Sequence, residues 1–192
     1  MDLPLIEIVL LAGGEGRRLG GLPKPLLRGP DGRTLLERAL WAYRAYGVAW
    51  VVAPQVLHPP LRAVSPSFRL LDDPGEGPAV ALQVVWPALS AEWIWVAAAD
   101  HPDPEVSLVE RLRLAAAGHA GAQVLRQGIA QPMPGIYRRT AWAGPARSLR
   151  ALFAPLDLAQ IDEAELTPSE RASLEDVDLP TDVSRHGLLR PG

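Results

Sequence analysis

The stretch LAGGEGRRLGGLPK, residues 11–24, places five glycines, two arginines and the only lysine of the chain directly behind an apolar run. That run, residues 6–12, is almost continuously apolar, as expected of a strand buried on both faces. Glycines after such a strand let the backbone approach a ligand closely and direct its N–H groups toward anionic oxygens. Because cations flank these glycines, we expect the loop to bind a triphosphate.

Two familiar phosphate-binding motifs do not fit the spacing of this loop. A Walker A loop needs Lys directly after Gly and before Ser or Thr, whereas Lys24 stands between two prolines. The dinucleotide fingerprint needs G-x-G-x-x-G, whereas Gly14, Gly16 and Gly20 give G-x-G-x-x-x-G. The same glycines would also suit a tight turn that binds nothing, so the prediction needs support from the rest of the chain.

Composition excludes several classes of protein. The chain has 192 residues, 48% of them hydrophobic, and a net charge of −3, which describes a single domain over residues 1–192. Without cysteine it has no thiolate metal site and no thiol nucleophile, and its excess of acidic residues, 22 against 19, argues against a nucleic-acid partner. The longest apolar stretch, residues 3–12, is shorter than the roughly 18 residues of a membrane span and lacks the basic start of a signal peptide. We therefore expect no membrane contact and a cytoplasmic location.

The basic residues comprise 18 arginines and one lysine, Lys24. Where arginine has replaced lysine almost everywhere, a remaining lysine marks a place that needs a compact, flexible ammonium group and not a planar guanidinium. The alternative is chance survival on a solvated loop.

Apolar runs alternate with amphipathic segments along the rest of the chain, which is typical of strands connected by crossover helices. We expect strands at 6–12, 48–53, 69–71, 93–99, 122–126 and 133–137, and helices at 34–46, 78–85, 104–117 and 140–153, the last containing Gly144-Pro145, a pair that can break or kink it. The predicted fold class is α/β, a three-layer sandwich with a mostly parallel central sheet. Such sheets bind ligands beyond the carboxyl ends of their strands, which selects the glycine loop, Asp72, Asp73 and Asp100.

Five segments, in order along the chain, resemble the MobA family of molybdenum cofactor guanylyltransferases. They are L-A-G-G at 11–14 with R-L-G-G at 18–21 and Lys24, G-P at 77–78, D-H-P at 100–102, Q-P at 131–132 with G-I-Y-R at 135–138, and V-D-L-P-T-D at 177–182. The resemblance implies a Rossmann-like GT-A nucleotidyltransferase fold.

It also implies a reaction, the Mg²⁺-dependent transfer of GMP from GTP to a molybdenum-bearing molybdopterin with release of pyrophosphate. By resemblance Arg18, Lys24 and Asp100 are catalytic, and Asp100 and Asp178 hold the metal. The implied nucleotide-binding residues are Leu11, Ala12, Gly13, Gly14, Lys24, Asp72, Asp73, Gly77 and Asp100. Of the two adjacent aspartates we slightly prefer Asp72. We expect a monomer that contacts other cofactor-biosynthesis proteins transiently.

Three departures from the family pattern concern substrate choice. Asp178 stands where the family has Asn, A-V-A at 79–81 replaces L-A-G, and Ala53 or Pro54 replaces an Asn after the second strand. These changes weaken the inference of guanine more than that of nucleotidyl transfer. The alternatives are a related transferase that uses CTP or a sugar phosphate, and a non-catalytic nucleotide-binding or delivery protein of the same fold.

Other polar residues are expected to play no catalytic part. We expect the four histidines, His58, His101, His119 and His186, in solvent or in turns, and the acidic residues Asp162, Glu163, Glu165 and Glu170 on a solvated face. Trp93 and Trp95 are expected in the core. Arg138 and Arg139 either contact the phosphate of the pterin acceptor or simply begin a helix.

Overall fold

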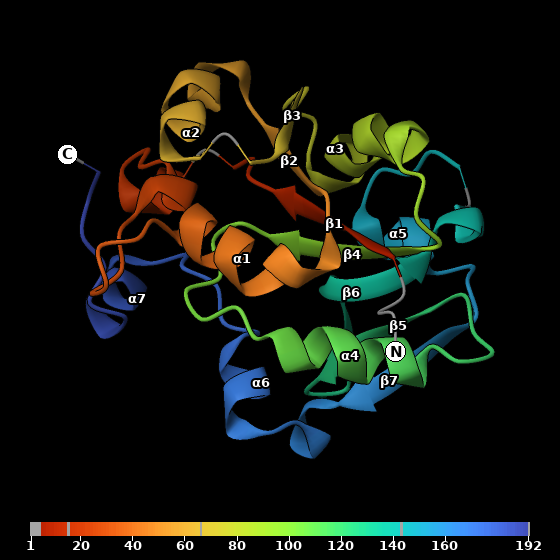
Figure 1. Ribbon diagram of the computed structural model, residues 1–192. Helices are drawn as coiled ribbons and strands as arrows, with labels where there is room; N and C mark the ends of the chain where they lie inside the picture. Colours follow the sequence, from red (N-terminus) through yellow and green to blue (C-terminus); the bar gives the residue numbers. More distant parts are fainter. Residues whose placement is uncertain (1–4, 15, 66, 143, 192) are drawn as a thin grey trace.

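The computed structural model describes residues 5–14, 16–65, 67–142 and 144–191. Within these residues a seven-stranded sheet has the order β3-β2-β1-β4-β6-β5-β7 (Figure 1). The strands are β1 (Ile6–Leu11), β2 (Ala49–Ala53), β3 (Arg69–Asp72), β4 (Trp93–Ala98), β5 (Gly121–Arg126), β6 (Ile129–Arg138) and β7 (Leu158–Asp162). Strand β6 is antiparallel to both of its neighbours, and the other adjacent strands are parallel. The predicted mostly parallel sheet is confirmed.

Helices cover both faces of the sheet, as a three-layer sandwich requires (Figure 1). They are α1 (Leu35–Tyr43), α2 (His58–Val64), α3 (Pro78–Val85), α4 (Val106–Ala115), α5 (Leu149–Phe153), α6 (Pro168–Ala172) and α7 (Pro180–Arg185). Side chains of β1 alternate between the faces: Ile8 and Leu10 pack with α1, α2 and α4, whereas Val9 packs with α3 and α5. Trp93 and Trp95 are buried in the core, as expected. Among the described residues, every helix is too short or too polar to cross a membrane.

The reversed direction of β6 follows from a tight turn. Only Gln127 and Gly128 separate β5 from β6, and both have positive φ, 52° and 73°. Such two-residue turns connect antiparallel strands, because their twist matches that of the hairpin. The strand expected at 133–137 therefore forms a longer hairpin partner of β5, starting at Ile129.

The helix predicted at 140–153 is wrong over most of its length, since α5 covers only Leu149–Phe153. Pro145 has no N–H to donate, and Gly144 has a φ of 96°, so a continuous helix is interrupted there. The side chain of Ser148 then caps the first turn of α5. Elements without a prediction are α2, β7, α6 and α7.

A third apolar cluster joins the end of the chain to the glycine loop. It consists of Leu19, Leu27, Leu35, Val177 and Leu188. Next to it Arg28 and Leu189 exchange two backbone hydrogen bonds of 2.9 and 2.7 Å. Figure 1 shows α7 beside the segment that follows β1. This packing places Asp178 within reach of Lys24, 154 positions away in sequence.

Candidate active site

A cleft of about 1130 Å³ opens at the carboxyl edge of the sheet. Strands β1 and β4 are adjacent and parallel, with Leu11 opposite Ala98, so the segments that follow them leave the sheet side by side. The cleft is lined by these segments, by those that follow β2 and β3, by the last residue of β5, by part of β6 and by residues between 174 and 178. This edge is where the alternation of strands and helices predicts a ligand.

The glycine loop needs glycine for two separate reasons. Positive φ angles, between 54° and 115°, occur at Gly14, Gly16, Gly20 and Gly21. In addition, a Cβ at Gly16 would lie 2.3 Å from the carbonyl oxygen of Leu22, and one at Gly13 would lie 2.0 Å from Oδ2 of Asp73. The loop thus folds tightly onto itself and onto the segment after β3.

Lys24 lies between two carboxylates at the base of the cleft. Its Nζ donates to Oδ2 of Asp100 at 2.9 Å and to Oδ1 of Asp178 at 2.5 Å. The three side chains are 16%, 17% and 42% exposed, in the order Lys24, Asp100, Asp178. A single tetrahedral ammonium reaches carboxylates from two distant segments, which explains why a lysine is needed here.

The charge of Lys24 is stabilised by these neighbours. Burial alone would lower the pKa of its ammonium group, but the negative charge of Asp100 and the hydrogen bonds to Asp178 and Asp100 outweigh it. The pKa of Lys24 is therefore raised above its ordinary value, and the side chain is a cation at neutral pH.

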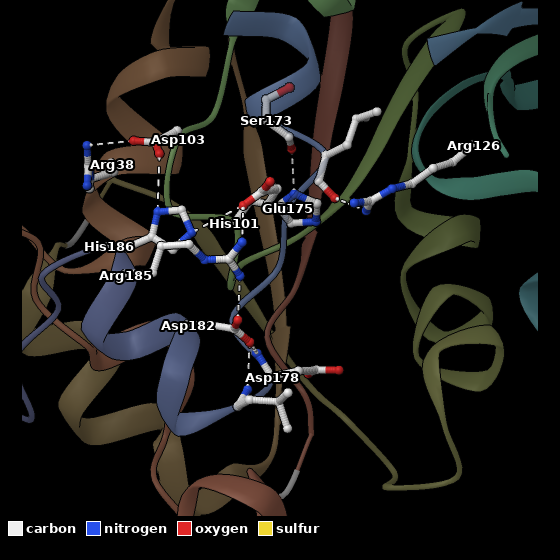
Figure 2. A network of polar contacts seen from close by, with 12 residues as sticks. Arg38, His101, Asp103, Arg126, Ser173, Glu175, Asp178, Asp182, Arg185 and His186 are labelled. Atoms are coloured by element: carbon white, nitrogen blue, oxygen red, sulfur yellow. Dashed lines mark hydrogen bonds and ion pairs between the residues drawn. The ribbon is translucent and has the colours of Figure 1, made fainter. Parts of the chain in front are cut away.

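The side chain of Asp182 fixes the backbone at Asp178 through hydrogen bonds (Figure 2). The carboxylate of Asp182 accepts the N–H groups of Asp178 and Leu179 at 3.0 and 2.7 Å, and it pairs with Arg185 at 2.5 Å. Hydrogen bonds from Leu179 and Asp178, together with Arg185, lower the pKa of Asp182 although the group is buried. A buried, charged carboxylate thereby fixes the turn that presents Asp178 to Lys24.

Asp100 offers an oxygen without a protein partner. Its Oδ1 is buried and has no hydrogen-bond partner within the described residues, while Oδ2 accepts from Lys24. A buried carboxylate oxygen left in this state is costly unless a ligand completes it. Together with Asp178 it supplies the hard oxygen ligands that Mg²⁺ prefers, so the residues present fit this metal. In the described part of the chain no three acidic or histidine side chains cluster as a complete metal site, so a bound metal would need phosphate or water oxygens as further ligands.

Most of the site residues inferred from the sequence line the cleft. The exceptions are Ala12, Arg18 and Asp72. Those in its wall are Leu11, Gly13, Gly14, Lys24, Asp73, Gly77, Asp100 and Asp178. Ala12 is buried, and its N–H donates to the carbonyl of Val52 at 2.8 Å. Arg18 is 72% exposed, with a nitrogen 3.5 Å from Asp178. The N–H of Ala12 is thus occupied within the sheet, and Arg18 lies outside the cleft wall.

Of the two adjacent aspartates, Asp73 and not Asp72 lies in the cleft wall. Asp72 is the last residue of β3 and its side chain is 61% exposed, 4.0 Å from His58. Asp73 instead accepts the N–H of Gly75 at 2.9 Å, which turns its carboxylate toward the glycine loop. The slight preference for Asp72 is therefore not supported by its position.

Several residues of the cleft or its surroundings lie elsewhere than expected. His101 is buried and lines the cleft, with Nδ1 2.6 Å from the carbonyl oxygen of Ser173, so it is not in solvent, although it directly follows the turn at residues 99–100. Glu170 is also buried and paired with Arg111, at 3.0 Å, so the solvated acidic face does not extend to it. The cleft further includes Arg126 and Asp176, for which the sequence gave no signal, and Arg17 and Gln131, which were named only within the glycine loop and the Q-P motif. His101 had a signal in its position beside Asp100.

Comparison with known proteins places this geometry in a family. Residues 8–163 match the family described as "MobA-like NTP transferase domain". The chain belongs to this family. A curated relative from Pseudomonas entomophila (strain L48), named molybdenum cofactor guanylyltransferase, is 30% identical over 177 residues, which cover 85% of this chain and 90% of the relative.

Solved structures agree on the fold of this MobA-like protein. Molybdopterin-guanine dinucleotide biosynthesis protein A from Archaeoglobus fulgidus superposes with a TM-score of 0.75 at 19% identity, covering 94% of this chain and 96% of the other. Rv0371c from Mycobacterium tuberculosis H37Rv, solved in complex with manganese, gives 0.68 at 19% identity, covering 94% and 97%. The α/β nucleotidyltransferase fold and the MobA resemblance inferred from the sequence are both confirmed.

Proposed function

We propose that the chain transfers GMP from GTP to the terminal phosphate of a molybdopterin-type acceptor. An oxygen of the acceptor phosphate attacks the α-phosphorus of GTP, a new P–O bond forms, and the bond to the bridging oxygen breaks so that pyrophosphate leaves. The acceptor phosphate is already ionised at neutral pH, so the reaction needs no protein base. The name of the curated relative and the charges in the cleft support this proposal.

The nucleoside belongs on the side of the cleft formed after β2 and β3. This wall is largely apolar, with Pro54, Val56 and Leu57 on one side and Pro78 on the other. The side chain of Val56 is 79% exposed, an apolar surface that a flat base can cover. Asp73 supplies a carboxylate acceptor for the N–H donors of the nucleoside.

The phosphates belong along the glycine loop, next to Lys24. The loop directs backbone toward the cleft at Gly13 and Gly14, and the lysine cation lies at the base, where negative charge develops on the departing pyrophosphate. Asp100 and Asp178 would hold Mg²⁺, which when bound would supply positive charge that neutralises the phosphates. The protein thus acts by positioning and by charge.

One observation carries the proposal, the contact of Lys24 with both Asp100 and Asp178. It joins the end of β4, the loop after β1 and the C-terminal segment at one point of the cleft. A purely structural glycine turn would not require a partly buried cation between two acids, one of which keeps an unsatisfied oxygen.

The first experiment is a thermal-shift panel of GTP, CTP, ATP and UTP, each with and without Mg²⁺. A ligand at about 100 times its Kd stabilises the folded state by about 2.7 kcal/mol, which is readily measured. Pyrophosphate release with GTP and the pterin acceptor then tests transfer. Preference for CTP would move the proposal to a cytidylyltransferase, and GTP binding without pyrophosphate release would favour a non-catalytic carrier.

A further inference from the structure

One basic side chain of the cleft comes from the wall opposite the glycine loop. Arg126 is the last residue of β5, and β5 is antiparallel to β6, which is antiparallel to β4. Strand β5 is therefore parallel to β4, and its carboxyl end lies at the same edge of the sheet as Asp100. Arg126 lines the cleft together with Gln131 and Met133 of β6.

The charges on this wall give Arg126 a specific importance. Among the described residues that line it, from β5 to the C-terminal segment, the charged side chains are Arg126, Asp176 and Asp178. An anionic acceptor that enters from this side meets Asp176 and Asp178; Asp178 is already paired with Lys24, and Arg126 is the cation of this wall. Lys24 lies between Asp100 and Asp178, where the leaving group is expected.

Local contacts orient the guanidinium of Arg126 but occupy only part of its hydrogen-bonding capacity. One terminal nitrogen of Arg126, which is labelled in Figure 2, donates to the carbonyl oxygen of Leu174 at a long 3.3 Å, and Nε lies 3.7 Å from Oε2 of Glu163. A guanidinium has five N–H donors in a planar fork, and the side chain is 42% exposed. Long contacts of this kind yield to a bidentate phosphate, which is a stronger partner.

Arg138, which the sequence also offered as a contact for the acceptor phosphate, lies at the opposite edge of the sheet. Arg138 pairs in register with Trp93, the first residue of β4, because β6 runs backwards along the sheet. Its guanidinium lies 4.4 Å from the ring centroid of Trp93 and forms an ion pair with Glu92. Arg138 therefore lies at the amino end of β4, away from Asp100.

We infer that Arg126 binds the terminal phosphate of the acceptor and that Met133 and Leu174 provide the apolar wall beside it. The inference rests on the proposed function and adds the site that holds the nucleophile. Lys24 and Arg126 then divide the work: the lysine receives the departing pyrophosphate and the arginine fork orients the attacking phosphate. A guanidinium fits this second role because its fork matches two phosphate oxygens.

The test compares Arg126→Gln with the matched control Arg138→Gln, in the full chain with Mg²⁺. We expect Arg126→Gln to raise the KM for the acceptor at least about 10-fold, the usual effect of losing a hydrogen bond to a charged group, with the KM for GTP within about 2-fold of wild type. Arg138→Gln should leave both values unchanged. Arg126→Lys, which keeps the charge and loses the fork, should fall between Arg126→Gln and wild type.

A binding cycle separates this inference from the proposed function. Titration of wild type and Arg126→Gln with a pterin phosphomonoester and with the same pterin lacking phosphate isolates the contribution of the phosphate. We expect the phosphate to tighten binding to wild type about 10-fold or more and binding to Arg126→Gln only slightly. Equal phosphate effects in both proteins would overturn the inference even if GMP transfer is confirmed. Absence of transfer by wild type, with the phosphate effect still dependent on Arg126, would overturn the proposed function alone.

Discussion

Lys24 is the one lysine of the chain, and replacing it by methionine removes the ammonium group that lies between Asp100 and Asp178. The two carboxylates are then left without that cation between them. Methionine keeps most of the length and the apolar stem of lysine, so the change is largely one of charge. We expect two separable effects. The folded state loses stability, which Mg²⁺ restores, and the enzyme loses turnover, which Mg²⁺ does not restore.

The expected loss of stability follows from the exposure of the three groups. Exposed ion pairs contribute at most about 1 kcal/mol, whereas removal of one partner from a buried pair costs about 3–5 kcal/mol. With side chains 16%, 17% and 42% exposed, the contact lies between these limits. We therefore expect the free energy of unfolding to fall by about 2 kcal/mol at pH 7. Because the pKa of Lys24 is raised, this contribution is complete below its ordinary pKa of 10.5 and is lost only as the pH rises through the raised value.

The expected loss of turnover is larger. Removing one charge contact from a transition state lowers kcat by about 100- to 1000-fold. Lys24→Arg separates charge from shape, because its planar fork retains the positive charge but cannot place one nitrogen between both carboxylates. We expect this variant to keep most of the stability and to remain strongly impaired in pyrophosphate release.

Urea unfolding at pH 7, with and without Mg²⁺, measures the first effect, and steady-state pyrophosphate release measures the second. Mg²⁺ should stabilise Lys24→Met more than wild type, because the lysine ammonium no longer competes with Mg²⁺ for the two carboxylates. Two results would refute the reasoning: turnover within a few-fold of wild type, or a loss of stability that Mg²⁺ leaves untouched. The second result would mean that Asp100 and Asp178 do not form a cation site.

Three further predictions concern the residues that shape the site. Asp182→Ala should lower the apparent Mg²⁺ affinity of the protein about 10-fold, measured by thermal shift, because the turn that presents Asp178 loses two backbone hydrogen bonds; an unchanged Mg²⁺ titration would contradict this. Gly16→Ala should reduce the free energy of unfolding in urea by about 2 kcal/mol or more, since φ is 54° and the Cβ would meet Leu22; a neutral effect would show that the loop relaxes. Burial alone would raise the pKa of Glu170, but hydrogen bonds from Arg111 and Thr167 lower it, so the advantage of wild type over Glu170→Gln should be full above pH 4.5 and shrink as the pH falls. A gap independent of pH would contradict that assignment.

The local parts of the site were predictable from sequence because they follow from strand ends. Residues 6–12 are apolar enough to be buried on both faces, and the glycines directly after them can only form a turn at the sheet edge. Asp100 follows a second buried run in the same way. Such residues share an edge whenever the strands are parallel, whatever the order of the strands in the sheet.

The pairing of Lys24 with Asp178 had no such local signal. The two residues are brought together by an apolar cluster in which Leu19 and Leu27 pack against Val177 and Leu188. Periodicity within one segment does not report which distant segment it packs against. The family resemblance alone suggested that the C-terminal motif returns to the cleft.

The direction of β6 decides which arginine faces the cleft, and this is the step that sequence periodicity could not supply. A strand pattern is the same read in either direction, so residues 133–137 gave no direction, and Arg138 was as eligible for phosphate as any other basic residue. The turn at Gln127 and Gly128 reverses β6, which carries Arg138 to the far edge and leaves Arg126 at the near one.

The charges around Lys24 and Arg126 account for the separate roles that we propose for these two cations. Lys24 with Asp100 and Asp178 carries a net charge of −1, and Arg18 beside Asp178 and Arg17 in the cleft wall add positive charge around these groups. The opposite wall adds Asp176, and Arg126 is the cation of that wall. Two anionic substrates must nevertheless approach within bonding distance of each other. In the mechanism that we propose, a compact ammonium shared between two acids and a guanidinium on the opposite wall would meet this need at two separate points and would hold the attacking and leaving groups on opposite sides of the α-phosphorus.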